Sequence, residues 1–282
     1  MQTDPIYEDD FVLEIVQQFA PGSAKVLRID EQGGSARTYH IEGGVTLKVL
    51  RPTRKTSKGY IEREVFLLKQ LEAAGVPNIP RSLGYEKRGA LEYNCMTTIA
   101  GDAVRFSRLT PTQHKEMLYK LGETLYQIHH IDLAPFYESG LNFDTYTSDE
   151  AVKRQAWHYF NLALDKMAKR LDHSQIDKAR AKADKHIAKI TRTRPKMRHA
   201  DPSDEHVFVE NGEYSGVIDF GDAYISHPAF DFRRWPHADR GALLEGYLSV
   251  GEVEDGFLDA CECIFAVENI LDELRKGLIN HD

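Results

Sequence analysis

The chain lacks several features that define large protein classes. It has only three cysteines in 282 residues (Cys95, Cys261 and Cys263), which argues against a disulfide scaffold and for a reducing compartment. No apolar run approaches the roughly 20 residues that a membrane-spanning helix needs. The N-terminus has neither the basic start nor the apolar stretch of a signal peptide. The sequence therefore predicts a cytoplasmic protein that does not interact with membranes.

The chain also has fewer basic than acidic residues. The chain has 36 Lys and Arg against 44 Asp and Glu, a net charge of −8. Because the nucleic-acid backbone is anionic, this balance argues against nucleic-acid binding and suits a cationic small molecule better. Hydrophobic residues make up 41% of the chain and aromatic residues 10%, enough for a core, so intrinsic disorder is excluded. The length allows one large domain or two smaller ones.

The first hundred residues predict a sheet with one inserted helix. A short helix over residues 11–19 comes first. Strands are then expected at residues 25–29, 38–41, 45–50, 83–85 and 91–99, with a helix at 60–74 between the third and the fourth. Gly101 marks a predicted boundary. We therefore expect an N-terminal domain over residues 1–100 and a C-terminal domain over residues 101–282.

The second domain is predicted to be mainly helical. Apolar periodicity indicates helices at residues 111–131, 148–171, 174–190, 240–248 and 256–278. A short hairpin interrupts them, with strands at 206–209 and 217–220 around the Asn211-Gly212 turn.

The segment from His199 to Asp222 carries the most specific motif. Asp201 is followed five residues later by His206, and Asp219 comes thirteen residues after that, beyond the predicted hairpin. A carboxylate can orient an attacking hydroxyl and accept its proton, which suits Asp201. A second carboxylate can bind Mg²⁺, which prefers oxygen ligands, and this suits Asp219. Protein kinases place a catalytic Asp, a metal-binding Asn and a D-F-G Asp in this order.

These motifs resemble the aminoglycoside phosphotransferase family of small-molecule kinases. That family has H-G-D-x-x-x-x-N followed by I-D-x-G-D-A, and this chain has H-A-D at 199–201 and I-D-F-G-D-A at 218–223. Two departures stand out: Ala200 replaces the glycine, and His206 replaces the asparagine. The histidine is similar to the variant in 2″-aminoglycoside and macrolide phosphotransferases. The resemblance covers nearly the whole chain.

The resemblance implies an α+β, two-lobe protein-kinase-like fold with a small β-rich N-terminal lobe and a larger α-helical C-terminal lobe. Lys48 on the third strand is similar to the family's nucleotide lysine, and Glu64 on the next helix is placed to pair with it. Asp201 would be the catalytic base, and His206 and Asp219 would hold Mg²⁺. The segment Met96, Thr97, Thr98 and Ile99 resembles the hinge that binds the nucleotide. Gly33 and Gly34 would be a shortened glycine-rich loop.

The predicted enzyme is a phosphotransferase with an alcohol group as acceptor. It would move the γ-phosphoryl of ATP or GTP to a hydroxyl of an aminoglycoside-like molecule, an activity associated with antibiotic resistance. Glu268 and Asp272, four residues apart on the last predicted helix, are candidates for binding a cationic acceptor. A solvated acidic face would explain them equally. A monomer or a homodimer is expected.

Other functions remain open at this stage. The acceptor could be a macrolide or a metabolite alcohol such as homoserine or a sugar. His206 and the thin glycine loop also fit a pseudokinase, which binds nucleotide with little or no turnover. A metallohydrolase built on His199, Asp201 and His206 ranks last, because it leaves Lys48 and Glu64 without a role.

Overall fold

The computed structural model describes the chain except for residues 1–3, 32, 54–58, 193 and 278–282. Contacts divide it into two compact units. Unit 1 comprises residues 1–117, 131–143 and 201–223, and unit 2 comprises residues 118–130, 144–200 and 224–282. The division does not follow chain order, because segment 201–223 joins the unit that the first 117 residues form. The domain boundary expected after residue 100 stays a prediction.

Unit 1 is built on an antiparallel sheet of five strands in the order β1-β2-β3-β5-β4, with a smaller sheet β6-β8-β9. Its elements are α1 (Asp9–Gln17), β1 (Val26–Asp30), β2 (Ala36–Ile41), β3 (Val45–Leu50), α2 (Tyr60–Ala73), β4 (Ser82–Arg88), β5 (Leu91–Thr97), β6 (Asp102–Ala103), a 3-10 turn (Val104–Phe106), α4 (Ala134–Glu138), β8 (Val207–Glu210) and β9 (Glu213–Val217). Every strand predicted for the larger sheet is present. The predicted helix at 60–74 ends one residue earlier.

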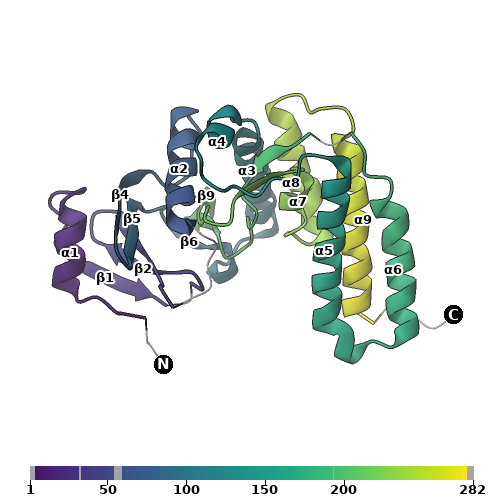
Figure 1. The fold of residues 1–282 in the computed structure, drawn as a ribbon, viewed down its shortest axis with the longest axis horizontal. Helices are drawn as coiled ribbons and strands as arrows, with labels where there is room; N and C mark the ends of the chain where they lie inside the picture. The colour runs from purple at the N-terminus through teal and green to yellow at the C-terminus, as the bar shows by residue number, and fades with distance from the viewer. Residues whose placement is uncertain (1–3, 32, 54–58, 193, 278–282) are drawn as a thin grey trace. The chain divides into compact units, whose positions relative to one another are not determined.

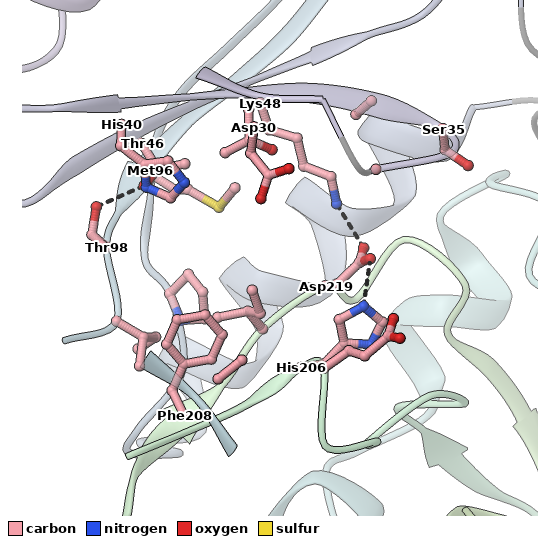
Figure 2. A pocket seen from close by; sticks show the side chains of 18 of the residues that line it. Asp30, Ser35, His40, Thr46, Lys48, Met96, Thr98, His206, Phe208 and Asp219 are labelled. Carbon is pink, nitrogen blue, oxygen red and sulfur yellow. Dashed lines mark hydrogen bonds and ion pairs between the residues drawn. The ribbon is translucent and has the colours of Figure 1, made fainter. Parts of the chain in front are cut away.

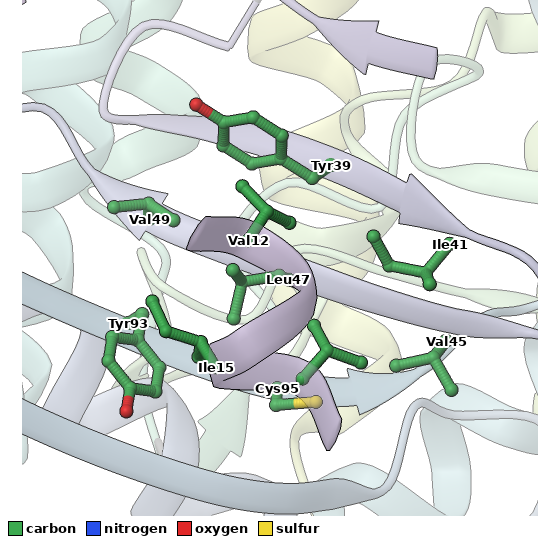
Figure 3. Close-up of a cluster of buried hydrophobic side chains, with 10 residues drawn as sticks. Val12, Ile15, Tyr39, Ile41, Val45, Leu47, Val49, Tyr93 and Cys95 are labelled. Carbon is green, nitrogen blue, oxygen red and sulfur yellow. The ribbon is translucent and has the colours of Figure 1, made fainter. Parts of the chain in front are cut away.

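Strand β3 is buried on both faces because helices cover the two sides of the sheet. Its odd positions, Val45, Leu47 and Val49, pack with Val12 and Ile15 of α1 in one apolar cluster (Figure 3). The even positions face the opposite side, since successive strand residues alternate. There Ile61 and Val65 of α2 belong to a second apolar cluster, against which Leu50 of β3 packs. Lys48 therefore lies on the face that α2 covers.

One predicted strand is wrong. The sequence predicts a strand at residues 217–220, but β9 ends at Val217. Asp219 has a φ of 70°, a left-handed conformation that a strand does not accommodate. The sequence analysis also missed β6, β7, β10, α4 and α7, which have only two to five residues each and show no periodicity.

Unit 2 is mainly helical. It contains most of α3 (Pro111–His129), then α5 (Asp149–Met167), a 3-10 turn (Ala168–Arg170), α6 (His173–Ile187), β7 (Lys196–Arg198), β10 (Tyr224–Ser226), α7 (Ala229–Phe232), α8 (His237–Val250) and α9 (Phe257–Arg275). Helices α5, α6 and α9 lie side by side (Figure 1). Asp172 caps α6 in a capping box with Gln175. Residue 278, the predicted end of the last helix, lies outside the described residues.

Strands β7 and β10 pair in a short antiparallel sheet of unit 2. In the part of the chain that the structure describes, no helix combines the length and the apolar character that crossing a membrane requires.

Candidate active site

A buried ion pair joins β3 to α2. Nζ of Lys48 lies 2.8 Å from Oε1 of Glu64, and the Glu64 side chain is 1% exposed. The backbone N–H of Phe220 donates to the same oxygen at 3.1 Å. Burial alone would lower the pKa of Lys48, but the carboxylates of Asp219 and Glu64 outweigh it and hold that pKa well above its ordinary value. Lys48 is therefore protonated at neutral pH.

Asp219 lies on the other side of Lys48. Its Oδ1 accepts hydrogen bonds from Lys48 Nζ at 2.7 Å and from the hydroxyl of Tyr60 at 3.0 Å. Its Oδ2 faces Nε2 of His206 at 3.4 Å (Figure 2). Burial raises the pKa of Asp219, but the positive charge of Lys48 outweighs burial and holds that pKa well below its ordinary value. Asp219 is thus ionised at neutral pH.

His206 connects Asp219 to Asp201. Nδ1 of His206 lies 2.8 Å from the backbone oxygen of Asp201 and 3.6 Å from its Oδ2. A carbonyl oxygen only accepts, so Nδ1 carries the proton, and in a neutral imidazole the lone pair on Nε2 faces Asp219. Two acceptors that face each other across 3.4 Å suit a shared cation.

Asp219 supplies the carboxylate oxygen that Mg²⁺ prefers, and His206 adds a nitrogen donor beside it. This ion takes one or two protein ligands and completes its shell with water and substrate phosphates. Among the described residues, no group of three or more His, Cys, Asp or Glu could hold a metal ion. A metallohydrolase built on His199, Asp201 and His206 would need such a group, so this alternative gains no support.

A cavity of about 790 Å³ in unit 1 brings most of the predicted site residues together. Ten of them line it: Gly33, Gly34, Lys48, Met96, Thr97, Thr98, Ile99, Asp201, His206 and Asp219. Glu64 lies behind Lys48, in contact with its ammonium group. The sheet strands, the segment 96–99 and the segment that carries Asp201, His206 and Asp219 therefore meet at one cavity.

The structure places Glu268 and Asp272 in α9 of unit 2. Glu268 is buried, and its Oε1 lies 3.3 Å from a guanidinium nitrogen of Arg233. Asp272 pairs with Arg275, one turn along the helix. Their role in binding an acceptor stays a prediction.

Sequence reasoning missed several polar residues that line the cavity. Thr46, which was missed, has its hydroxyl 2.6 Å from that of Thr98, a predicted hinge residue, and His40, also missed, is on the neighbouring strand (Figure 2). Thr46 is two residues before Lys48, so the strand alternation places it on the same face. Tyr60 is four residues before Glu64, so helical spacing places both on one face of α2. The spacing of Thr46 from Lys48 and of Tyr60 from Glu64 could therefore have identified Thr46 and Tyr60 from the sequence.

A second buried network, in unit 2, holds the chain just before Asp201. Oδ1 of Asp231 accepts from Arg198 at 2.7 Å and from the backbone N–H of Ala200 at 3.0 Å. Its Oδ2 accepts from the backbone N–H of His199 at 2.9 Å and lies 2.9 Å from Nε2 of His129. Asp231 therefore fixes the backbone of the two residues that precede Asp201.

The five-stranded sheet with its Lys–Glu pair, the helical C-terminal region and the D-F-G-type aspartate define a protein-kinase-like fold. Residues 26–258 match the phosphotransferase enzyme family, and the chain belongs to it. No curated protein matches its sequence.

Solved phosphotransferase structures resemble the chain at low sequence identity. The GDP complex of an aminoglycoside 2′-phosphotransferase-IIIa is 18% identical, with a TM-score of 0.68 over 95% of this chain and 92% of that one. The streptomycin–ATP complex of APH(2″)-IIa is 17% identical, with a TM-score of 0.60 over 97% and 96%. The macrolide 2′-phosphotransferase MphH from Brachybacterium faecium is 18% identical, with a TM-score of 0.62 over 95% and 93%. These similarities establish the fold.

Proposed function

We propose that this phosphotransferase moves the γ-phosphoryl group of ATP or GTP to a hydroxyl of a small molecule. The observation that carries the proposal is the position of Lys48 between two carboxylates, 2.8 Å from Glu64 and 2.7 Å from Asp219, in a cavity that Asp201 and His206 also line. Family members solved with GDP and with ATP support a nucleotide donor.

Each residue has a role in the proposed reaction. Lys48, oriented by Glu64, holds phosphate oxygens of the donor. Asp201 orients the acceptor hydroxyl and takes its proton as the hydroxyl oxygen bonds to the γ-phosphorus. The bond from that phosphorus to the bridging oxygen breaks, and the nucleoside diphosphate leaves. Catalysis of this kind depends mainly on positioning and on neutralising charge.

His206 and Asp219 are the residues that would hold Mg²⁺. Their facing acceptor atoms and the ionised state of Asp219 support this assignment. When bound, the ion would neutralise charge on the phosphates.

For the acceptor we propose an aminoglycoside-like molecule first and a macrolide second. The net charge of −8 and the neighbours solved with streptomycin and kanamycin support the first. The second is favoured by the ion pairs of α9: Glu268, Asp272 and Glu273 face Arg233, Arg275 and Lys182, which reduces the negative charge offered to a polyamine.

Transfer from radiolabelled ATP and GTP to a panel of aminoglycosides, macrolides, homoserine and sugars tests the proposal. We expect a labelled product with one acceptor class, formed far more slowly by Asp201→Asn. Nucleotide binding with no transfer to any acceptor would instead support a pseudokinase.

The salt dependence of KM separates the two proposed acceptor classes. For a polycationic acceptor KM should rise steeply with salt, because exposed charges are screened beyond about 10 Å at 0.1 M. A macrolide, which carries one amine, should show a much shallower dependence.

A further inference from the structure

Tyr60 is the first residue of α2 and is 4% exposed. Its hydroxyl donates to Oδ1 of Asp219 at 3.0 Å. The ammonium group of Lys48 lies 5.1 Å from the centre of its ring. On Gly221, a Cβ would overlap the Tyr60 ring, so the backbone of the D-F-G segment packs directly against it. Contacts on the ring thus fix where the hydroxyl lies.

The two oxygens of Asp219 are used differently. Oδ1 accepts from Lys48 and from Tyr60, whereas Oδ2 faces His206 at 3.4 Å. Holding Oδ1 sets the rotation of the carboxylate about its last bond. That rotation decides whether Oδ2 and Nε2 of His206 converge on one point.

Lys48 and Tyr60 do not hold Asp219 in the same way. Lys48 is a flexible chain that ends in a point charge, and in the proposed reaction the phosphates of the donor compete with Asp219 for its protons. Tyr60 has only two side-chain torsions and a neutral hydroxyl that donates a single proton. The Tyr60 bond therefore stays in place when Lys48 turns toward a nucleotide.

We propose that Tyr60 is a positioning residue for Asp219: its hydroxyl holds Oδ1 so that Oδ2 and His206 converge on the divalent cation that accompanies the nucleotide. The inference rests on the proposed function, because it takes Asp219 and His206 as the cation ligands. It adds a residue from α2, outside the catalytic motifs, to the determinants of cation binding.

The test measures how strongly Mg²⁺ and nucleotide binding are coupled. Dissociation constants for ATP and for GTP are determined by isothermal titration, once with excess Mg²⁺ and once with EDTA. The dissociation constant in EDTA divided by the dissociation constant with Mg²⁺ measures the coupling. We expect Tyr60→Phe, which keeps the ring, to reduce this ratio about tenfold, because a hydrogen bond to a charged group is lost. Affinity in EDTA should stay within about twofold of wild type.

Tyr85→Phe is the matched control. The Tyr85 hydroxyl also donates to a carboxylate, that of Glu92 at 3.2 Å, but Tyr85 does not line the cavity. The ratio of dissociation constants in EDTA and with Mg²⁺ should be the same for Tyr85→Phe as for wild type. An unchanged ratio in Tyr60→Phe, or an equal loss of affinity with Mg²⁺ and with EDTA, would overturn the assignment. Both constants come from the folded protein, so a less stable variant still gives a valid ratio. If wild type bound neither nucleotide, the proposed function itself would fail.

Discussion

Nζ of Lys48 lies 2.7 Å from Oδ1 of Asp219, although 171 residues separate the two in the chain. The same ammonium group lies 2.8 Å from Glu64. One cation thus neutralises two carboxylates, and both carboxylates lose this counter-charge if it is removed.

Lys48 and Glu64 should therefore behave as one unit. Lys48→Met leaves Glu64 buried without its cation, and we expect a loss of about 3–5 kcal/mol in the free energy of unfolding. Glu64→Gln should also destabilise, and the double variant should lose clearly less than the sum of the two. Each single change should raise KM for the nucleotide more than for the acceptor. Denaturant titrations of the four proteins, together with steady-state kinetics, test both statements.

The control pair is Lys87 and Glu92. It has the same 2.8 Å separation, but the Lys87 side chain is 51% exposed. Lys87→Met and Glu92→Gln should couple by less than about 1 kcal/mol, because water screens the exposed charge. If the changes at Lys48 and Glu64 were strictly additive, the two would not act together.

Asp201→Asn keeps the shape of the side chain and removes the proton acceptor. We expect kcat to fall by a factor on the order of 10²–10⁴ with little change in nucleotide affinity. The measurement uses the acceptor that the panel identifies. Asp204→Asn, at an exposed position three residues further on, should keep wild-type turnover. Near-normal turnover in Asp201→Asn would remove Asp201 from the role of base.

Gly221 should tolerate no side chain. In Gly221→Ala the new Cβ would overlap the ring of Tyr60, so we expect a loss of about 1–3 kcal/mol in stability and weaker binding of the Mg²⁺–nucleotide complex. Gly241→Ala is the opposite case, because that glycine lies inside α8 with open space around it. It should raise stability by about 0.5–1 kcal/mol. Thermal melting measures both, and a stable, tightly binding Gly221→Ala would contradict the packing argument.

Ala200 has a φ of 78°, in the left-handed region that glycine occupies at little cost. We expect Ala200→Gly to raise the free energy of unfolding by about 1 kcal/mol, because the strain of the Cβ is removed. Ala188→Gly should lower it by a similar amount, since Ala188 has a helical φ of −57°. Denaturant titration gives the sign of each effect. A destabilised Ala200→Gly would mean that the left-handed backbone carries no strain.

The pH dependence of stability should depend in part on His227. Burial, with the charge of Arg198 nearby, lowers the pKa of His227 to about 3. In the unfolded chain it is about 6.5, so between these values the unfolded state binds more protons than the folded state. Stability should therefore fall as pH drops below about 6.5, by about 1.4 kcal/mol per pH unit from this residue alone.

His227→Asn tests this contribution. Nδ1 of His227 accepts from the backbone N–H of Ala229 at 3.2 Å, and an asparagine oxygen can accept in its place. We expect a shallower decline in stability between pH 7 and pH 5 than in wild type, measured by denaturant titration at each pH. An identical slope would assign the acid sensitivity to other groups.

Most of the larger sheet and the longer helices could be predicted from the sequence, because their signals are local. Alternating residues in β3 and helical spacing in α2 are repeated over six and fourteen residues. The end of β9 could not be predicted in this way. Its apolar pattern continues to Phe220, but the left-handed Asp219 interrupts the strand.

The sequence by itself determined which residue types could perform phosphoryl transfer, since the spacing of Asp201, His206 and Asp219 within one segment is a property of the chain. Tertiary structure decided which groups touch. It placed Lys48 between Glu64 and Asp219 and the Tyr60 hydroxyl on Asp219. The physical reason is the distance along the chain over which each signal acts. Periodicity in the sequence relates residues that are only a few positions apart. A 2.7 Å contact between residues 171 positions apart depends instead on how the sheet, the helix and the loop pack around it.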